Sequence, residues 1–321
     1  MISNTLSITK NQSVFLTLEH LFQSFIIFVF ICFFTELQAE KAAPGSYSNL
    51  TTALENPLKV RELNLSWQEI TSLPSEIEKF RNLKSLNLFK NNLESLPVEI
   101  GKLKNLKSLN LGLNPLITFP KEIEQLNDLL ELDFSGNKLE VLPNEILQLK
   151  NLTDLSLASN ELLTLPEEIG KLLNLQKLTL GNNEIITLPE TIGQLHSLKE
   201  LDLNSNKLTT LPDSIGQLRN LRSLTLNDNQ LTNLPNEFGQ LKDLQELQLI
   251  GNKLEALPKE IGQLKNLKSL SLGGNGITKF PEEIGQLQNL KLLFLDNQSI
   301  PIPSLEKEKI RKLLPKCKIY F

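Results

Sequence analysis

Acidic side chains are the first candidates for chemistry in this chain. Six of them recur at two fixed positions of short leucine-containing segments: Glu131, Asp133, Asp154, Glu200, Asp202 and Glu246. Paired carboxylates about 5 to 9 Å apart can hydrolyse a glycosidic bond, and clustered carboxylates can bind calcium. Sites for small ligands are usually enclosed pockets. The elements that carry these residues therefore decide which use is open to them.

A nucleophilic site is a second possibility, and it rests on two residues. Outside the first 39 residues the chain has one histidine, His196, and one cysteine, Cys317. The repeat pattern of the chain separates them by about six strand spacings, roughly 29 Å, whereas a Cys/His pair needs hydrogen-bond contact. Serines such as Ser156 and Ser223 are expected on the opposite side of the coil from His196. The usual phosphate-binding and zinc-binding motifs do not occur, so we expect no enzyme activity, metal or cofactor.

The elements that carry these residues are copies of one 23-residue unit. Its pattern is L-x-x-L-x-L-x-x-N-x-L-x-x-L-P-x-x-I-x-x-L-x-x, and a fixed period of this kind indicates a stacked repeat architecture of the leucine-rich type. The first residues of the ten full copies are Val60, Leu83, Leu106, Leu129, Leu152, Leu175, Leu198, Leu221, Leu244 and Leu267. A partial copy begins at Leu290.

Each unit predicts a short strand followed by an irregular return path. In the copy at Leu198, Leu201 and Leu203 alternate with polar residues, which is the pattern of a strand with one buried face. The proline after the strand, Pro212 in this copy, cannot donate to a sheet ladder and excludes a central strand there. Gly216 is expected to relieve crowding. The predicted fold class is therefore an α/β solenoid, an arc with a parallel sheet on its concave side and brief helical turns on its convex side.

A row of asparagines is predicted to be structural. An inward amide supplies both donors and an acceptor to backbone groups where the chain leaves each strand. The row comprises Asn91, Asn114, Asn137, Asn160, Asn183, Asn206, Asn229, Asn252 and Asn275. Gln68 and Gln298 replace asparagine in the outermost copies, as expected for atypical terminal repeats.

The residues that vary from copy to copy on the concave side are the predicted partner-binding residues. They are Trp67, Phe89, Leu113, Glu131, Asp133, Asp154, Lys177, Glu200, Asp202, Glu246, Gln248 and Phe294. Because these acids lie on an open curved face, we interpret them as a solvated binding surface rather than a catalytic or metal site. Trp67, Phe89 and Leu113 lie at successive strand exits and predict one exposed apolar cluster, unless the N-terminal segment covers it.

The first 39 residues differ in composition from the repeats. A run of ten apolar residues, 25–34, is too short to span a bilayer and suits a signal peptide cleaved after Ala39. Residues 1–39 are accordingly predicted to be a signal peptide and the protein to be exported. A retained N-terminus and a cytoplasmic location is the alternative.

The two ends of the stack are predicted to be caps. Residues 40–59 form a linker and an N-terminal cap, with a helix that begins at Ser48 as N-cap and ends at Pro57. The repeats fill 60–299. In the C-terminal cap, 300–321, Leu305 to Leu314 predict an amphipathic helix begun by Ser304. Leu314, Cys317 and Ile319 then imitate the strand pattern, which predicts a last strand with Cys317 buried at a leucine position.

Composition narrows the class of partner. The formal net charge is −4, with lysine and glutamate scattered along the repeats. A nucleic-acid-binding protein would carry a basic stripe, so we expect a protein ligand, no nucleic acid, no membrane span and a monomer.

From Leu37 onward the chain resembles the exported 23-residue leucine-rich-repeat proteins of pathogenic spirochaetes. The resemblance is carried by residues 37–40, 49–58 and 310–321 and by the recurring L-P-x-E-I-G-Q-L-x-N-L. More distantly, the L-P-x-x-I-x-x-L units are similar to the intracellular Ras-suppressor and plant disease-resistance type. The first resemblance implies a binding protein that meets host proteins, and the second implies an intracellular scaffold.

Overall fold

The computed structural model describes residues 44–321. The chain divides into two units, Met1–Ser46 and Tyr47–Phe321. The predicted signal peptide and Cys32 lie outside the described residues. The second unit contains all of the repeats.

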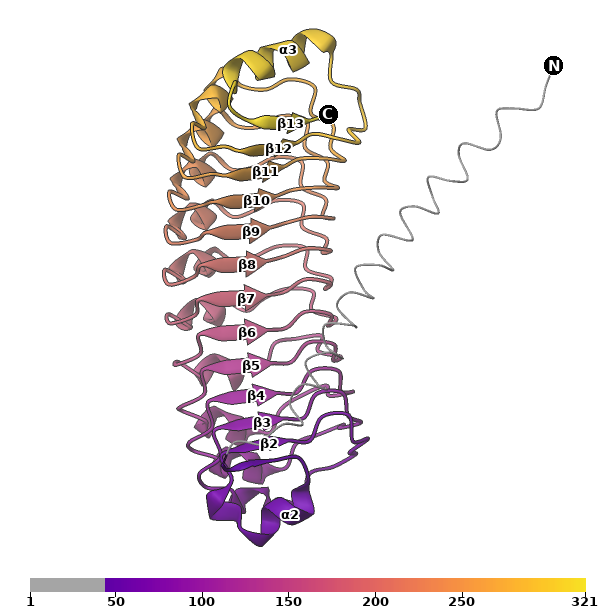
Figure 1. The fold of residues 1–321 in the computed structure, drawn as a ribbon, viewed down its shortest axis with the longest axis vertical. Coiled ribbons are helices and arrows are strands. Elements are labelled where there is room, and N and C mark those ends of the chain that lie inside the picture. The colour runs from indigo at the N-terminus through magenta and orange to yellow at the C-terminus, as the bar shows by residue number, and fades with distance from the viewer. Residues whose placement is uncertain (1–43) are drawn as a thin grey trace, which may run out of the picture. The chain divides into compact units, whose positions relative to one another are not determined.

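One sheet of 13 strands runs through the repeats in chain order, and Figure 1 shows its strands stacked from indigo to yellow. The strands are β1 (Ser46–Tyr47), β2 (Glu62–Asn64), β3 (Ser85–Asn87), β4 (Ser108–Asn110), β5 (Glu131–Asp133), β6 (Asp154–Ser156), β7 (Lys177–Thr179), β8 (Glu200–Asp202), β9 (Ser223–Thr225), β10 (Glu246–Gln248), β11 (Ser269–Ser271), β12 (Leu292–Phe294) and β13 (Lys318–Tyr320). Neighbours pair in parallel, and each leucine meets the equivalent leucine of the next copy, as Leu201 meets Leu224. The prediction of a leucine-rich solenoid with a parallel sheet is confirmed.

The return path of each full copy holds a short 3-10 helix. These helices are η3 (Ser75–Lys79), η4 (Val98–Lys102), η5 (Lys121–Gln125), η6 (Ile146–Gln148), η7 (Glu167–Lys171), η8 (Glu190–Gln194), η9 (Asp213–Gln217), η10 (Asn236–Gln240), η11 (Lys259–Gln263) and η12 (Glu282–Gln286). A further 3-10 helix, η2 (Pro57–Lys59), precedes the first copy. From η3 to η5 and from η7 to η12 a proline stands immediately before the helix in an extended conformation, as Pro212 does (φ −67°, ψ 150°). Its fixed φ suits this approach, and its missing N–H costs nothing at a helix start.

The core is one continuous column between the strands and the 3-10 helices. In the copy at Leu198 the side chains of Leu201, Leu203, Leu208, Ile215 and Leu218 are all buried. The same positions are buried along the stack, so each copy encloses its apolar side chains only together with its neighbours.

Helix α2 (Leu50–Glu55) precedes the first full copy, and its start corrects the sequence prediction. Asn49, not Ser48, is the N-cap, because its side-chain oxygen accepts from the N–H of Thr52 at 3.1 Å. The carbonyl of Ser48 instead accepts from the side-chain amide of Gln68 at 2.8 Å.

Helix α3 (Ser304–Leu313) precedes the last strand, and both its start and that strand's register differ from the prediction. Pro303 occupies the N-cap position, so Ser304 is already helical. Ile319 pairs with Leu293, the position at which Cys317 was expected. The return path through α3 is longer than the repeat, which shifts the register by two residues. Cys317 is therefore only half-buried and precedes β13.

None of the helices between residues 44 and 321 is long and apolar enough to cross a membrane.

Candidate concave binding face

Two rows of side chains project from the open face of the sheet, because strand residues alternate between the core and solvent. The first row is Glu62, Ser85, Ser108, Glu131, Asp154, Lys177, Glu200, Ser223, Glu246, Ser269, Leu292 and Lys318. The second row is Asn64, Asn87, Asn110, Asp133, Ser156, Thr179, Asp202, Thr225, Gln248, Ser271, Phe294 and Tyr320. Nine of the twelve predicted partner-binding residues lie in these two rows.

The centre of the first row carries most of the charge. Glu131, Asp154, Lys177 and Glu200 are neighbours in register. Lys177 forms an ion pair with Glu200 at 3.2 Å, with both side chains more than half exposed, so the pair adds little stability. A shallow depression of about 330 Å³ lies over β4 to β7 and includes Glu131, Asp154 and Lys177 in its lining. Carboxylates outnumber the single lysine here.

The acids of the second row are tied to the backbone. Asp133 accepts from the N–H and hydroxyl of Ser135 at 2.9 and 2.6 Å. Asp202 accepts from the N–H of Asn204 at 3.0 Å and from the hydroxyl of Thr225 at 2.8 Å. Asn64, Asn87 and Asn110 make the same bond to the N–H two residues on. This position therefore caps the strand exit in the manner of an Asx turn, a role that the sequence did not predict.

The N-terminal aromatic residues form a pair. The rings of Trp67 and Phe89 meet edge to face with centroids 6.1 Å apart, and the ammonium of Lys90 lies 5.9 Å from the Trp67 ring centre. Trp67 is 52% exposed, so the described chain leaves half of its surface open to a partner. Leu113, 40% exposed, points along the stack over Gly136.

A second aromatic pair closes the other end of the face. Phe294 stacks on Tyr320 with ring centroids 4.8 Å apart and 6° between the planes, and Lys318 lies 4.8 Å above the Tyr320 ring. Leu292 is adjacent in the first row. Tyr320 was missed as a candidate because the predicted register of the last strand was two residues off. The remaining candidates, Glu246 and Gln248, lie between the ends on β10, where Gln248 accepts from the side-chain amide of Asn227 at 2.8 Å.

Backbone geometry at the strand exits keeps these rows in place. The eighth residue of each copy has positive φ, as in Trp67 (60°), Leu113 (53°), Ser205 (52°) and Gly251 (67°). Non-glycine residues adopt this conformation only where the surrounding structure requires it. The chain therefore turns inward at the same point in every copy.

The predicted asparagine row lies directly beneath these turns, and all nine side chains are buried. The amide of Asn206 donates to the carbonyls of Leu180, Leu203 and Asn204 at 3.0 to 3.1 Å. Its oxygen accepts from the N–H of Ile185 at 3.0 Å. Gln298 makes equivalent bonds, to Leu272 and from Ile277, whereas Gln68 turns to Ser48.

Within the described residues, the two groups singled out for covalent chemistry, His196 and Cys317, belong to different parts of the stack: His196 to the copy at Leu175 and Cys317 to the segment after α3. His196 is exposed, and its carbonyl accepts from the side-chain amide of Asn220. Burial raises the pKa of the Cys317 thiol to about 11, which disfavours the reactive thiolate. Within residues 44–321 no three His, Cys, Asp or Glu side chains are grouped so that they could hold a metal ion. The arrangement is suited to binding.

Comparisons with known proteins agree with the repeat assignment. Three families match: Leucine-rich repeat region at residues 165–255, Leucine rich repeat at 242–300 and Leucine Rich Repeat at 82–103. No curated protein sequence matches the chain.

Among solved structures, a leucine-rich repeat protein of Leptospira interrogans is 37% identical, with a TM-score of 0.57 over 86% of this chain and 99% of that chain. The repeat ectodomain of the Arabidopsis thaliana receptor kinase GASSHO1/SCHENGEN3, in complex with Casparian strip integrity factor 2, is 31% identical. That match has a TM-score of 0.64 and covers 79% of this chain but only 34% of the receptor chain. The functional domain of InlJ from Listeria monocytogenes is 25% identical, with a TM-score of 0.64 over 75% of this chain and 50% of that domain.

Proposed function

The chain belongs to the leucine-rich repeat family, and on that premise we propose that it is a non-enzymatic module that binds a protein partner on its concave face. Proteins of this family and fold are typically interaction scaffolds, and similar structures include a receptor ectodomain solved with its ligand. Repeat stacks commonly bind through the concavity that they form.

The observation that carries the proposal is the contrast between two surfaces of the same stack. The concave rows change from copy to copy, from serine and asparagine near β3 to carboxylates at β5 to β8 and to Leu292, Phe294 and Tyr320 at the end. The 3-10 helices vary less: from η7 to η12 every helix has glycine at its fourth position, and all but η10 have isoleucine at the third. A varied surface can discriminate between partners, whereas a uniform one offers little to recognise.

The charges and rings on this face define the kind of partner that fits. The acids of β5 to β8 favour a basic segment and a salt-sensitive association rate. The aromatic pairs Trp67/Phe89 and Phe294/Tyr320 lie at opposite ends of the face, and exposed aromatic residues are common anchors of protein interfaces. An extended partner would contact both ends and the acidic centre.

We expect concave variants to weaken binding while convex variants do not. A partner is first captured by cross-linking to the full chain, identified by mass spectrometry, and then titrated by surface plasmon resonance. Trp67→Ala and Phe89→Ala should each weaken binding by more than about 1 kcal/mol. Glu131→Lys with Asp154→Lys should slow association at low salt.

The matched control is Glu167→Lys with Asp213→Lys, the same charge change on exposed residues of η7 and η9. Should this control abolish binding while folded concave variants bind normally, the proposed face would be the wrong one.

We further propose that the protein is exported and meets host proteins, as the resemblance to spirochaete proteins implies. The apolar run at 25–34 and Ala39 support a leader cleaved before Glu40. N-terminal sequencing of native protein should begin at or near Glu40. An intact Met1 on native protein recovered from the cytoplasm would reject export and favour the intracellular scaffold.

A further inference from the structure

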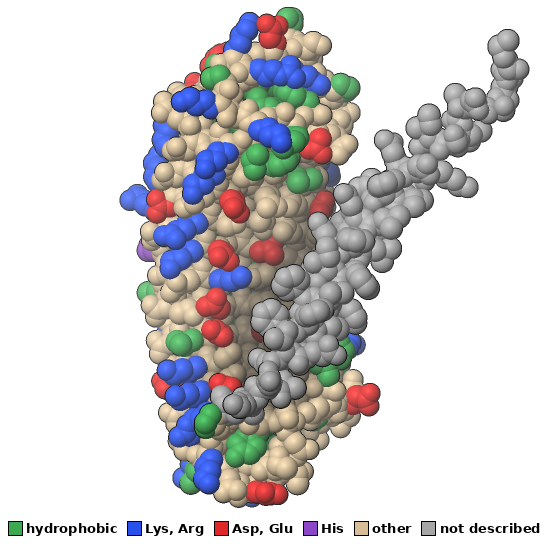
Figure 2. Space-filling model, viewed as in Figure 1, with side chains coloured by type: hydrophobic (Ala, Val, Ile, Leu, Met, Phe, Trp, Pro, Cys, Tyr) green, Lys and Arg blue, Asp and Glu red, His purple; other side chains and the backbone are tan. Residues whose placement is uncertain are grey.

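Basic side chains gather on one long edge of the sheet, where the strands begin, whereas the sequence analysis expected them to be scattered. We call this set the basic edge: Lys199, Arg219, Arg222, Lys242, Lys265, Lys268, Lys291 and Lys316, all of them exposed. The equivalent positions from His196 to Lys291 contain one acid, Asp243. Figure 2 shows Lys and Arg along the left of the molecule, the side from which the arrows of Figure 1 start.

Among the described residues, no carboxylate forms an ion pair with these cations. None of the ion pairs there involves the basic edge. Lys199 and Lys268 donate instead to the side-chain oxygens of Gln176 and Gln245, each at 2.7 Å. Lys265 donates to that of Gln286 at 3.1 Å. In a chain of net charge −4, this surface is therefore a local concentration of positive charge, with Asp243 as the one acid among its positions.

The backbone beneath the basic edge is held by a second row of asparagines. The amide of Asn220 donates to the carbonyl of His196 at 2.6 Å, Asn266 to Lys242 at 2.9 Å and Asn289 to Lys265 at 2.7 Å. Each bond joins a loop to the loop of the preceding copy. The loops that carry the cations are therefore held by hydrogen bonds, and equivalent cations in neighbouring copies are spaced by roughly 4.8 Å, the distance between strands.

A groove of about 410 Å³ runs beside the cations. Arg222, Lys268 and Lys291 line it together with the amides of Gln245, Asn266 and Asn289 and with one carboxylate, Asp243. Cations and amides in one groove suit a ligand that presents both anionic groups and hydroxyls, since guanidinium and ammonium groups bind oxyanions and amides bind hydroxyls.

We infer that the basic edge is a binding site for a linear sulfated polysaccharide. A thin chain with sulfates at short intervals can follow the rows of cations, and its hydroxyls can meet the groove amides. The carboxylates of Glu200 and Glu246 border the basic edge on the concave face and disfavour a broad polyanion such as a nucleic acid duplex. Single strands are bound by stacking on aromatic rings, and the residues of the basic edge include none.

The test uses the full chain and a heparin-derived decasaccharide as the probe, with binding measured by isothermal titration calorimetry. Binding is expected at 50 mM salt, with at least tenfold lower affinity at 300 mM because the contacts are screened. Arg222→Glu with Lys268→Glu should lower the affinity at least tenfold.

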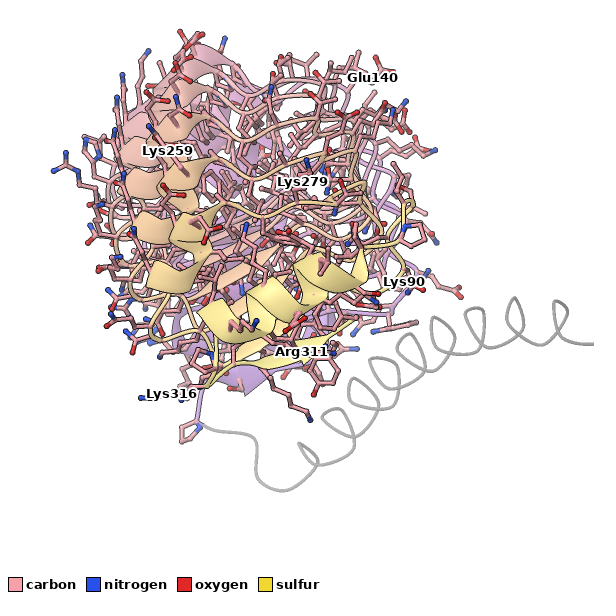
Figure 3. All side chains as sticks on the ribbon, turned by 90° about the horizontal axis from the view of Figure 1, so that it is seen from above. Lys90, Glu140, Lys259, Lys279, Arg311 and Lys316 are labelled. Carbon is pink, nitrogen blue, oxygen red and sulfur yellow. The ribbon has the colours of Figure 1, made fainter. Side chains whose placement is uncertain are left out.

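The matched control is Lys121→Glu with Lys259→Glu, which places the same charge change on η5 and η11. In Figure 3, Lys259 lies over the row of 3-10 helices, whereas Lys316 projects where β13 begins. The control should change the affinity less than twofold. Equal losses in the two variants would show that only net charge matters and would overturn the site.

Lysine footprinting of the unaltered protein gives a readout that does not depend on how a variant folds. The decasaccharide should protect Lys199, Lys242, Lys265, Lys268 and Lys291 from acetylation and leave Lys121 and Lys259 reactive. Unprotected basic-edge lysines at saturating decasaccharide would overturn the site.

Competition distinguishes the polyanions. The competitors are single-stranded DNA of matched charge and vesicles with about a third of anionic lipid. If either binds more tightly than the decasaccharide, the assignment to a polysaccharide is overturned. The basic edge does not include Trp67, so this inference can be tested separately from the concave-face proposal. Trp67→Ala should leave decasaccharide binding unchanged.

Discussion

Single polar side chains form many of the hydrogen bonds to backbone groups that regular secondary structure forms in other folds. The strands β2 to β13 are each three residues long and the 3-10 helices are short, so many backbone groups at the strand exits have no regular partner. Asn206 serves four of them, with bonds to Leu180, Leu203 and Asn204 and from Ile185. Two of these partners belong to the preceding copy. The amide thus joins neighbouring coils as well as closing its own turn.

Replacing Asn206 by alanine should therefore destabilise the fold by about 1 to 3 kcal/mol, because buried backbone groups lose their partners. Asn206→Asp should also destabilise, since a carboxylate would face three carbonyls. The measurement is the urea midpoint. Lys207→Ala is the control; its side chain is exposed and pairs with Glu184 on the surface, so the loss should stay within about 0.5 kcal/mol. Equal midpoints for Asn206→Ala and Lys207→Ala would contradict the role given to the asparagine.

At the residue scale, the sequence could predict the role of a side chain where its hydrogen-bond donors and acceptors leave one choice. The buried asparagine row is such a case, since an inward amide at a turn must satisfy backbone groups. The hydrogen bonds of Asp133 and Asp202 could not be assigned in the same way. A carboxylate on an exposed strand position is equally compatible with binding and with capping, and only the conformation of the strand exit decides between them.

Glycine sets the distance between neighbouring return paths. A side chain at Gly216 would overlap the carbonyl oxygen of Glu237 in the next copy, and the same holds for Gly193 against Ser214 and Gly262 against Glu283. The sequence predicted crowding at this position, and the crowding comes from the adjacent coil. Where the copy at Leu129 has Leu147 instead, that side chain is buried and η6 shortens to Ile146–Gln148.

Gly216→Ala should destabilise the protein by about 1 to 3 kcal/mol, the usual cost of overpacking. This exceeds the gain of about 0.4 to 1 kcal/mol that alanine brings by restricting the unfolded chain. Gly276→Ala is the matched substitution, because its new methyl group would meet its nearest neighbours only at 3.5 Å. Thermal unfolding should separate the two, and a Gly216→Ala protein as stable as Gly276→Ala would show that the coils can move apart at little cost.

At the element scale, prediction worked where the period of 23 residues holds and was wrong where it breaks. Prolines and alternating leucines indicated the strands and their neighbours in order. The register of β13 was wrong because α3 lengthens the return path, and nothing in a short Leu-x-x-Cys-x-Ile pattern distinguishes two registers two residues apart. The left-handed residue at each strand exit was also missed, since Leu113 and Trp67 are poor signals for positive φ.

The whole molecule is a one-dimensional stack, so its stability is approximately a sum over copies and the interfaces between them. The last interface is made by α3. Ile310 of this helix is fully buried. The carboxylate of Glu306 accepts from the N–H of Phe280 at 2.8 Å, and the ammonium of Lys309 donates to the carbonyl of Phe280 at 2.9 Å. We propose that α3 closes the end of the apolar column, which would otherwise be exposed to water.

In such a stack, a substitution at one end should destabilise only the copies near that end. Ile310→Ala should cost about 2 kcal/mol or more, in the range for removing a buried aliphatic side chain. Because interfaces act between neighbours, the loss should appear as faster amide hydrogen exchange in the last two copies and α3, with the amides of β3 to β5 unchanged. Leu305→Ala on the same helix is the control, since Leu305 is 82% exposed and should leave exchange as it was. Uniformly faster exchange along the whole stack in the Ile310 variant would mean that the copies unfold as one cooperative unit, and that α3 stabilises all of them rather than the last interface.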